Sequence, residues 1–293
     1  MDRTTPASPK PRLLVVGGSS YVGTACQCAL RDSFEVSATS RTGGGGTLAL
    51  DLGRPEAFDY AAIRPGDGVL VCAAISSPDV CANDHRRAQQ VNVTGPKYFA
   101  QNAVERGANV LFLSSDTVLG PTEQPADENA PVRPAGAYAN MKCEMENFLL
   151  AETPAKIVRL SLVMSLQDKF TRYVRDCVRR GSPPSLLHPL YRNAVHLADV
   201  TRLVGELLGN WPSHSGRIVH ACGSRCLSRI GLAEQLFGCL GYSGSYAVER
   251  PGAEFYQNRP ERIELRSLHL AALLGREPLA IGAGYAGELA HET

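Results

Sequence analysis

Short, nearly continuous apolar runs alternate with helix-length segments through the first half of this 293-residue chain. Five such runs occur between residues 12 and 162: LLVV, FEVSAT, GVLVCAA, NVLFLSS and KIVRLSL. Strands without polar alternation are buried on both faces, as in a parallel sheet that helices cover on each side. The pattern therefore predicts an α/β fold with a doubly wound parallel sheet, formed by residues 12–161.

The remainder of the chain has a looser pattern. Residues 162–293 contain helices, short strands and loops rich in proline and glycine, and we expect them to form a smaller part that mainly binds the substrate. Residues 1–11 are polar and proline-bearing, which predicts a disordered tail. Within the first part, a helical stretch from Asp84 to Arg106 is expected to break near Gly95 and Pro96.

The composition excludes several classes of function. A net charge of +1 leaves no basic excess for binding the phosphates of a nucleic acid. We find neither a secretion signal nor an apolar run of the length that spans a bilayer, so we expect a cytoplasmic protein without a membrane partner. The nine cysteines are scattered, and Cys222 and Cys226 have no second ligand pair, so no metal site is expected.

A glycine-containing turn follows the first apolar run. Its sequence is GGSSYVG, with Gly17 and Gly23 at the outer positions and Ser20 at the middle position. In a Rossmann fold, the turn after the first strand brings backbone N–H groups and a helix N-terminus to the pyrophosphate of a dinucleotide. The alternative is a tight turn without a ligand. The residues expected to bind the cofactor here are Gly17, Ser19, Ser20, Tyr21, Val22 and Gly23.

The end of the second strand indicates which dinucleotide binds. A site for NAD carries Asp or Glu there to hold the ribose 2′-hydroxyl, whereas this chain has Thr39, Ser40 and Arg41. The guanidinium of Arg41 suits a 2′-phosphate, which favours NADP, although a solvated loop arginine and NAD remain alternatives. Asp51 and Leu52 are expected to border the adenine.

Two residues four positions apart suggest carbonyl chemistry. Tyr138 and Lys142 lie in a segment with helical spacing that begins near Ala137, so both side chains are expected on one helix face. The ammonium of Lys142 would lower the pKa of Tyr138 and prepare it for proton transfer. The alternative is a core tyrosine beside a solvated lysine, since Met141 and Met145 share much of that face.

A serine at a strand end completes this constellation. Ser115 follows the strand NVLFL, at the edge of a parallel sheet where ligands bind in doubly wound folds. Its hydroxyl can donate a hydrogen bond to a carbonyl oxygen, or it can simply cap backbone groups at the strand exit.

These motifs, taken in order, resemble a known family. The stretches GGSSYVG, CAAI, VNV, FLSSDTVLG and YANMK resemble the signatures of extended short-chain dehydrogenases/reductases. Likeness is greatest to the dTDP-4-dehydrorhamnose reductase group, through SSDTVL, NAVHLADV and RPERIELRSL. The resemblance implies an NADP-dependent oxidoreductase that reduces a keto group of a nucleotide-linked deoxysugar, with a homodimer as a possible assembly. It further implies catalytic roles for Ser115, Tyr138 and Lys142, and cofactor contacts for Ala73, Ala74, Asn92, Tyr138 and Lys142.

The chain also departs from the family pattern. Related dehydratases need an Asp-Glu pair after the catalytic Ser or Thr, but Thr117 follows Asp116 here, so dehydration is not expected. Ile75 and Leu119 stand where aromatic residues are usual, which leaves the substrate open. Two alternatives remain: a nucleotide-sugar epimerase, and a non-catalytic NADP-binding regulatory subunit similar to that of methionine adenosyltransferase, which the stretches PDV and LSSDTVL resemble.

Overall fold

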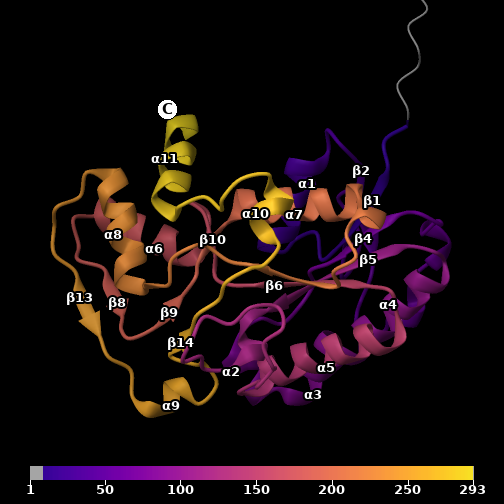
Figure 1. Cartoon of the computed structure of the whole chain (residues 1–293), viewed down its shortest axis with the longest axis horizontal. Coiled ribbons are helices and arrows are strands. Elements are labelled where there is room, and N and C mark those ends of the chain that lie inside the picture. Colours follow the sequence, from indigo (N-terminus) through magenta and orange to yellow (C-terminus); the bar gives the residue numbers. More distant parts are fainter. Residues whose placement is uncertain (1–8, 293) are drawn as a thin grey trace, which may run out of the picture.

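A seven-stranded sheet forms the centre of the protein in the computed structural model, which describes residues 9–292 (Figure 1). Every neighbouring pair in it is parallel, in the order β11-β6-β5-β4-β1-β2-β3. The doubly wound parallel sheet predicted from the sequence is therefore confirmed. Its strands are β1 (Arg12–Val16), β2 (Glu35–Ser40), β3 (Leu48–Ala49), β4 (Gly68–Val71), β5 (Asn109–Ser115), β6 (Lys156–Leu160) and β11 (Ile218–Ala221).

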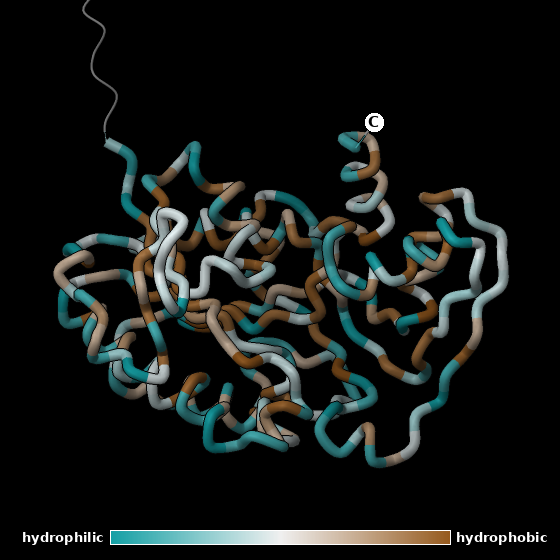
Figure 2. Tube along the Cα trace, turned by 180° about the vertical axis from the view of Figure 1, so that it is seen from behind, coloured by the Kyte–Doolittle hydropathy of each residue, from teal (hydrophilic) through white to brown (hydrophobic). Residues whose placement is uncertain are grey.

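Helices cover both faces of this sheet, and alternate residues of each strand serve the two resulting cores. In β1, Leu13 and Val15 pack on one face, whereas Leu14 and Val16 pack on the other, as strand periodicity requires. Figure 2 shows the hydrophobic residues concentrated along the central strands. One face is covered by α1 (Tyr21–Leu30), α7 (Leu197–Gly209) and α10 (Leu270–Leu274), and the opposite face by α4 (Gly95–Glu105) and α5 (Ala137–Glu152).

The helical stretch before α4 is irregular at a different place from the one predicted. It consists of α2 (Pro78–Asn83), α3 (His85–Gln89) and a π-helical turn (Gln90–Thr94) that leads directly into α4. The backbone stays helical where the π-helical turn ends and α4 begins, at Gly95 and Pro96, so the break expected at these two residues is wrong. Gly95 has a packing role instead, since a Cβ there would lie 1.9 Å from the carbonyl oxygen of Leu52.

The later part of the chain returns to the sheet. Strand β11 pairs with β6, and α7 and α10 pack on the core beside β1, so the division at residue 161 does not separate two bodies in space. A third core lies between α6, α8 and α11, away from the sheet (Figure 1). Its helices and the remaining elements are β7 (Val163–Met164), α6 (Lys169–Arg179), β8 (Ser185–Leu187), β9 (Tyr191–Arg192), β10 (Val195–His196), β12 (Leu227–Ser228), α8 (Arg229–Leu240), β13 (Ala247–Glu249), α9 (Ala253–Tyr256), β14 (Arg262–Ile263) and α11 (Ile281–Glu292).

The predicted tail of residues 1–11 falls mainly outside the described part of the chain. Residues 1–8 lie outside the described residues, and residues 9–11 are exposed and lead directly into β1. The prediction of disorder for this segment therefore stays a prediction.

Candidate active site

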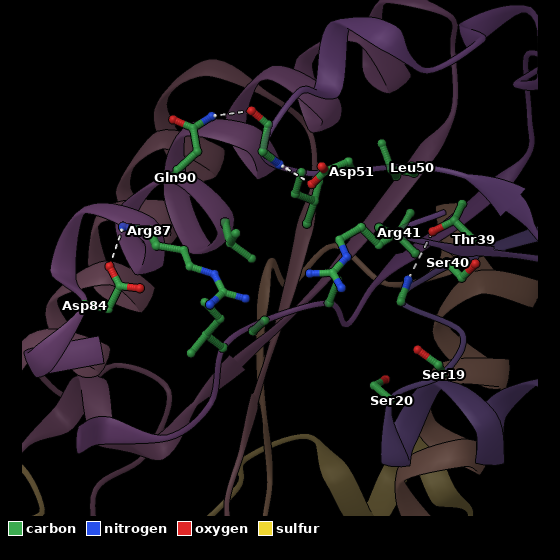
Figure 3. Close-up of a pocket in the computed structure, with 18 of the residues that line it drawn as sticks. Ser19, Ser20, Thr39, Ser40, Arg41, Leu50, Asp51, Asp84, Arg87 and Gln90 are labelled. Atoms are coloured by element: carbon green, nitrogen blue, oxygen red, sulfur yellow. Dashed lines mark hydrogen bonds between the residues drawn. The ribbon is translucent and has the colours of Figure 1, made fainter. Parts of the chain in front are cut away.

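A first cavity of about 920 Å³ lies at the carboxyl ends of β1, β2 and β4 (Figure 3). This is where a doubly wound sheet binds its ligand, because the strand order reverses around β1. We call it the cofactor pocket. Among the residues predicted to bind a cofactor, those that line it are Gly17, Ser19, Ser20, Ser40, Arg41, Asp51, Leu52, Ala73 and Ala74.

The glycine-containing turn lies close to the backbone of the segment that follows β4. Gly17 has a φ of +89°, and a Cβ on it would lie 2.7 Å from the Cα of Ala73. A Cβ on Gly23 would lie 2.4 Å from the carbonyl oxygen of Gly17. Larger residues would therefore push the turn apart and close the cradle that the first helix offers to a phosphate.

The side chains within this turn have separate roles. The Ser20 Oγ accepts a hydrogen bond of 3.1 Å from the backbone N–H of Gly23, so Ser20 caps the N-terminus of α1. Tyr21 and Val22 line a second cavity rather than the cofactor pocket. The Tyr21 hydroxyl donates a hydrogen bond of 2.6 Å to the Ser165 Oγ, which links the turn to the later part of the chain.

Asn92 supports the cofactor pocket indirectly, through the backbone of Ile75. This side chain is 3% exposed and lies in the π-helical turn. Its Oδ1 accepts a hydrogen bond of 2.8 Å from the Ile75 N–H, and its Nδ2 donates one of 3.0 Å to the Ile75 carbonyl oxygen. Asn92 thus holds the segment after β4 that lines the pocket, although it does not line the pocket itself.

Two further arginines line the cofactor pocket, and neither was predicted from the sequence. Arg86 and Arg87 lie on α3, while Arg41 follows β2. Figure 3 shows the guanidinium groups of Arg41 and Arg87 pointing toward one another across the pocket. The only signal in the sequence was the basic pair in the stretch DHRRAQQ, whose position in space depends on the fold.

A second cavity of about 640 Å³ brings together the three predicted catalytic residues, and we call it the catalytic cavity. Ser115 ends β5, and Tyr138 and Lys142 project from the first turns of α5, which begins at Ala137 as expected. Ser20 and Ala74 line both cavities, so the catalytic cavity adjoins the cofactor pocket.

Lys142 is deeply buried within the catalytic cavity. Its side chain is 4% exposed, and Nζ donates a hydrogen bond of 2.7 Å to the Leu113 carbonyl oxygen. The same Nζ lies 4.4 Å from the centroid of the Phe112 ring. Burial lowers the pKa of Lys142 to about 8, against an opposing influence of Glu146.

The lowered pKa expected for Tyr138 is wrong. Although Nζ lies 5.9 Å from the Tyr138 ring centroid, the pKa of Tyr138 is raised above its ordinary value. Burial is the main cause, the carboxylate of Asp116 adds to it, and a hydrogen bond with Ser115 opposes it. Tyr138 therefore keeps its proton at neutral pH, as a proton donor must.

Asp116 connects Ser115 with the later part of the chain. Its Oδ1 accepts a hydrogen bond of 3.3 Å from the Ser115 Oγ, and its Oδ2 accepts one of 3.1 Å from the Ser161 Oγ. The Nε of Arg192 lies 3.6 Å from Oδ2. Burial still raises the pKa of Asp116, with Arg192 opposing the shift.

The catalytic cavity has a cationic lining. Arg192, Arg229 and Arg259 line it together with Lys142, and Asp116 is the one carboxylate among its described lining residues. These arginines were missed, because they lie far apart in the sequence: Arg192 is in the short strand β9, Arg229 begins α8, and Arg259 follows α9. In the part of the chain that the structure describes, the buried Nη1 of Arg229 has no hydrogen-bond partner. Unpaired buried donors of this kind are rare in proteins.

Ile75 and Leu119, which stand where aromatic residues are usual, do not line the catalytic cavity, whereas Thr117 does. Ile75 lines the cofactor pocket. Leu119 is 3% exposed and packs in a small core with Val118 and Cys143. Ile75 also packs against the same small core as Tyr138.

A metal-ligand cluster and a membrane-spanning helix are both absent from the described residues. Within residues 9–292, no group of three or more His, Cys, Asp or Glu side chains is arranged to hold a metal ion, and both Cys222 and Cys226 are free thiols. No helix in the same range is long and apolar enough to cross a membrane.

Comparisons with known proteins identify the family of this chain. The family model described as "RmlD substrate binding domain" matches residues 11–279. The dTDP-4-dehydrorhamnose reductase of Mycobacterium tuberculosis is 27% identical, over 92% of this chain and 88% of that protein. Methionine adenosyltransferase 2 subunit beta of Bos taurus is 24% identical, over 73% of this chain and 67% of that protein.

Solved structures share the fold. The dTDP-4-dehydrorhamnose reductase of Bacillus anthracis, in complex with NADP, superimposes with a TM-score of 0.80 at 19% identity, covering 97% of this chain and 100% of that one. Fold and site define an extended short-chain dehydrogenase/reductase-like protein. Because the family model spans most of the sequence, the chain belongs to the RmlD substrate-binding-domain family.

Proposed function

We propose that this protein is an NADP-dependent reductase of a keto group in a nucleotide-linked deoxysugar, similar to dTDP-4-dehydrorhamnose reductase. One observation carries the proposal: Ser115, Tyr138 and Lys142 line a single cavity that opens beside the cofactor pocket. A carbonyl group placed there meets two hydroxyl donors and a buried cation.

The residues of the cofactor pocket fit the pyrophosphate and the 2′-phosphate of NADP. The close backbone approaches at Gly17 and Gly23 leave the N-terminus of α1 open to a pyrophosphate, and Arg41 supplies charge near the end of β2 for a 2′-phosphate. Asp51 and Leu52 border the adenosine end. When bound, NADPH supplies the hydride that the carbonyl carbon accepts.

The catalytic residues have distinct roles in this proposal. Tyr138 donates its phenolic proton to the carbonyl oxygen, and its raised pKa keeps that proton in place until the oxygen gains negative charge. Ser115 donates a hydrogen bond to the same oxygen. Lys142 binds the cofactor ribose and, as a cation, stabilises the tyrosinate that proton transfer leaves behind.

The lining of the catalytic cavity supports an anionic substrate. Arg229 has a buried N–H group without a partner, and Arg259 lies at the same cavity in an ion pair with Asp79. Guanidinium groups bind phosphate oxygens in pairs, so a nucleoside diphosphate would satisfy donors that the protein leaves open. Residues 162–293 supply these arginines, in line with a substrate-binding role for that part.

The cellular setting belongs to the same proposal. All nine cysteines are free thiols, which is typical of a reducing compartment such as the cytoplasm. The family resemblance also suggests a homodimer, and the sequence suggests no need for a metal, a nucleic acid or a membrane.

The decisive experiment follows NADPH after addition of a dTDP-4-keto-6-deoxy sugar. A reductase consumes one NADPH per sugar reduced. An epimerase would change the sugar without net oxidation of NADPH, and a regulatory subunit would bind NADPH, leave the sugar unchanged and alter the kinetics of a partner enzyme. Either of these two results would overturn the proposal. Screening other keto-sugars and simple ketones in the same assay identifies the substrate.

A further inference from the structure

Two arginines from different elements converge on the cofactor pocket. Arg41 enters it from the segment after β2, and Arg87 enters it from α3 on the opposite side (Figure 3). A residue at the end of the second strand is the usual place to distinguish the two nicotinamide dinucleotides, so Arg41 was expected. Arg87 is separated from it by 46 positions, and only the fold brings the two guanidinium groups together.

Neither guanidinium group has a bonding partner among the described residues. Within residues 9–292, no hydrogen bond or ion pair is made by the side chain of Arg41 or Arg87. The two carboxylates that line the pocket make backbone contacts instead: Asp51 accepts a hydrogen bond from the Gly53 N–H, and Asp84 accepts one from the Arg87 N–H. The donors of both arginines therefore remain available to a ligand.

The lining of the pocket carries more positive than negative charge. Three arginines line it, Arg86 included, against these two carboxylates. A dianionic phosphate between two opposed guanidinium groups would receive paired, charge-assisted hydrogen bonds from both sides.

We infer that Arg87 is a second specificity-determining residue, which binds the 2′-phosphate of NADP from the side opposite Arg41. This inference rests on the proposed function, because it needs a dinucleotide in the pocket. The pyrophosphate is a less suitable partner, since Figure 3 shows Ser19 and Ser20 of the phosphate-binding turn lying apart from Arg87, beyond Arg41. Selectivity for NADP is thus shared between two residues, and removal of one leaves part of it.

The test compares calorimetric titrations of NADPH, NADH and 2′,5′-ADP with single and double variants. We expect Arg87→Ala to lower the affinity for NADPH and for 2′,5′-ADP by about tenfold, in line with the loss of a charged hydrogen bond. The affinity for NADH should stay within about twofold of wild type. Arg41→Ala should lower the same two affinities by a similar factor, and the double variant should bind NADPH no better than NADH. Arg87→Lys keeps the charge and should recover part of the loss.

Arg54→Ala is the matched control. Arg54 is exposed and follows Gly53 at the rim, but it does not line the pocket, so this variant removes the same charge from the same neighbourhood. Its affinity for NADPH should stay within about twofold of wild type, because exposed charges at that range are screened.

The possible failures are distinct. Equal weakening of NADPH and NADH by Arg87→Ala would assign Arg87 to the pyrophosphate and overturn the inference. Unchanged NADPH binding by Arg87→Ala would overturn it as well and leave the proposed function standing. Equal binding of both dinucleotides by the wild type would overturn it together with the assignment of Arg41 to the 2′-phosphate, and would leave standing only the proposed reduction of a keto group. Wild-type protein that binds neither dinucleotide would instead refute the proposed function.

Discussion

The cofactor pocket and the catalytic cavity are built in different ways. All residues that line the cofactor pocket lie between positions 16 and 91, at the ends of β1, β2 and β4 and on the segments that follow them. The catalytic cavity draws its lining from Ser20 through Arg259, which is most of the chain. Residues that follow parallel strands meet at one sheet edge by construction, whereas loops of the later part reach the cavity only through tertiary packing.

Burial distinguishes the two sites as well. Arg41 and Arg87 are exposed, so their donors meet water when no ligand is bound. In the catalytic cavity, burial shifts the pKa values of Lys142, Tyr138 and Asp116, with the result that Lys142 holds its proton less firmly and the other two hold theirs more firmly. The cofactor pocket is thus suited to recognising charge, and the catalytic cavity to moving a proton.

The largest effect is expected from a buried ion pair between α5 and β6. Glu146 on α5 and Arg159 on β6 are each under 5% exposed, and the Arg159 Nη2 lies 2.8 Å from the Glu146 Oε2. Glu146→Gln leaves the charge of Arg159 uncompensated, which should lower the free energy of unfolding by about 3–5 kcal/mol. Urea denaturation, followed by circular dichroism, measures the change.

Glu152→Gln, at the exposed end of the same helix, is the control and should stay within about 0.5 kcal/mol of wild type. Because the later part of the chain supplies β11 to the sheet, we expect one transition in both variants. Two transitions, of which Glu146→Gln shifts only one, would show that the two regions unfold independently.

The next effect separates chemistry from cofactor binding. Tyr138→Phe removes the proposed acid but keeps the ring, so turnover should fall by about 10²-fold or more while the affinity for NADPH stays the same. Single-turnover kinetics and NADPH titration measure the two quantities. Wild-type turnover on a true substrate would remove Tyr138 from the mechanism and favour the regulatory subunit.

The smallest effect concerns pH. Because the folded pKa of Lys142 lies at about 8, below the ordinary value of 10.5, its ammonium is lost from the folded protein as the pH rises through about 8. The affinity for NADPH should then decrease, by no more than about tenfold, between about pH 7 and pH 9.5. Titrations across this range measure the decrease.

Lys142→Met provides the reference, since its affinity for NADPH should be lower than that of wild type and should not change over the same range. Folding stability should change with pH in the opposite direction from NADPH affinity. Between about pH 8 and 10.5 the unfolded state binds more protons at Lys142 than the folded state does, so the stability of wild type relative to Lys142→Met should increase as the pH rises. An equal decrease in NADPH affinity in the variant would assign the titration to another group.

Much of the cofactor side was predictable. The apolar runs located the core strands from β1 to β6 other than the short β3, and the turn at Gly17 to Gly23 lies where the sequence placed it. The family prediction is confirmed by the family model that spans residues 11–279. These signals are local, because strand burial, a strand-to-helix turn and the spacing of Tyr138 and Lys142 each depend on residues close together in the chain.

Other features could not be predicted because they depend on distant residues. Arg87 reaches the cofactor pocket only through the path of α3. Arg192 reaches Asp116 from a strand that starts more than 70 positions later. Each contact joins residues whose separation in sequence gives no sign of their proximity in space.

The sequence by itself determined the sheet, the glycine-containing turn after β1 and the shared helix face of Tyr138 and Lys142, because short-range periodicity and backbone sterics decide them. Only the tertiary structure decided that β11 completes the sheet, that arginines from three later segments face the catalytic cavity, and that Tyr138 holds its proton more firmly than a free tyrosine. The physical reason is desolvation: a pKa, or the availability of a donor, depends on how much water the whole fold removes around a group.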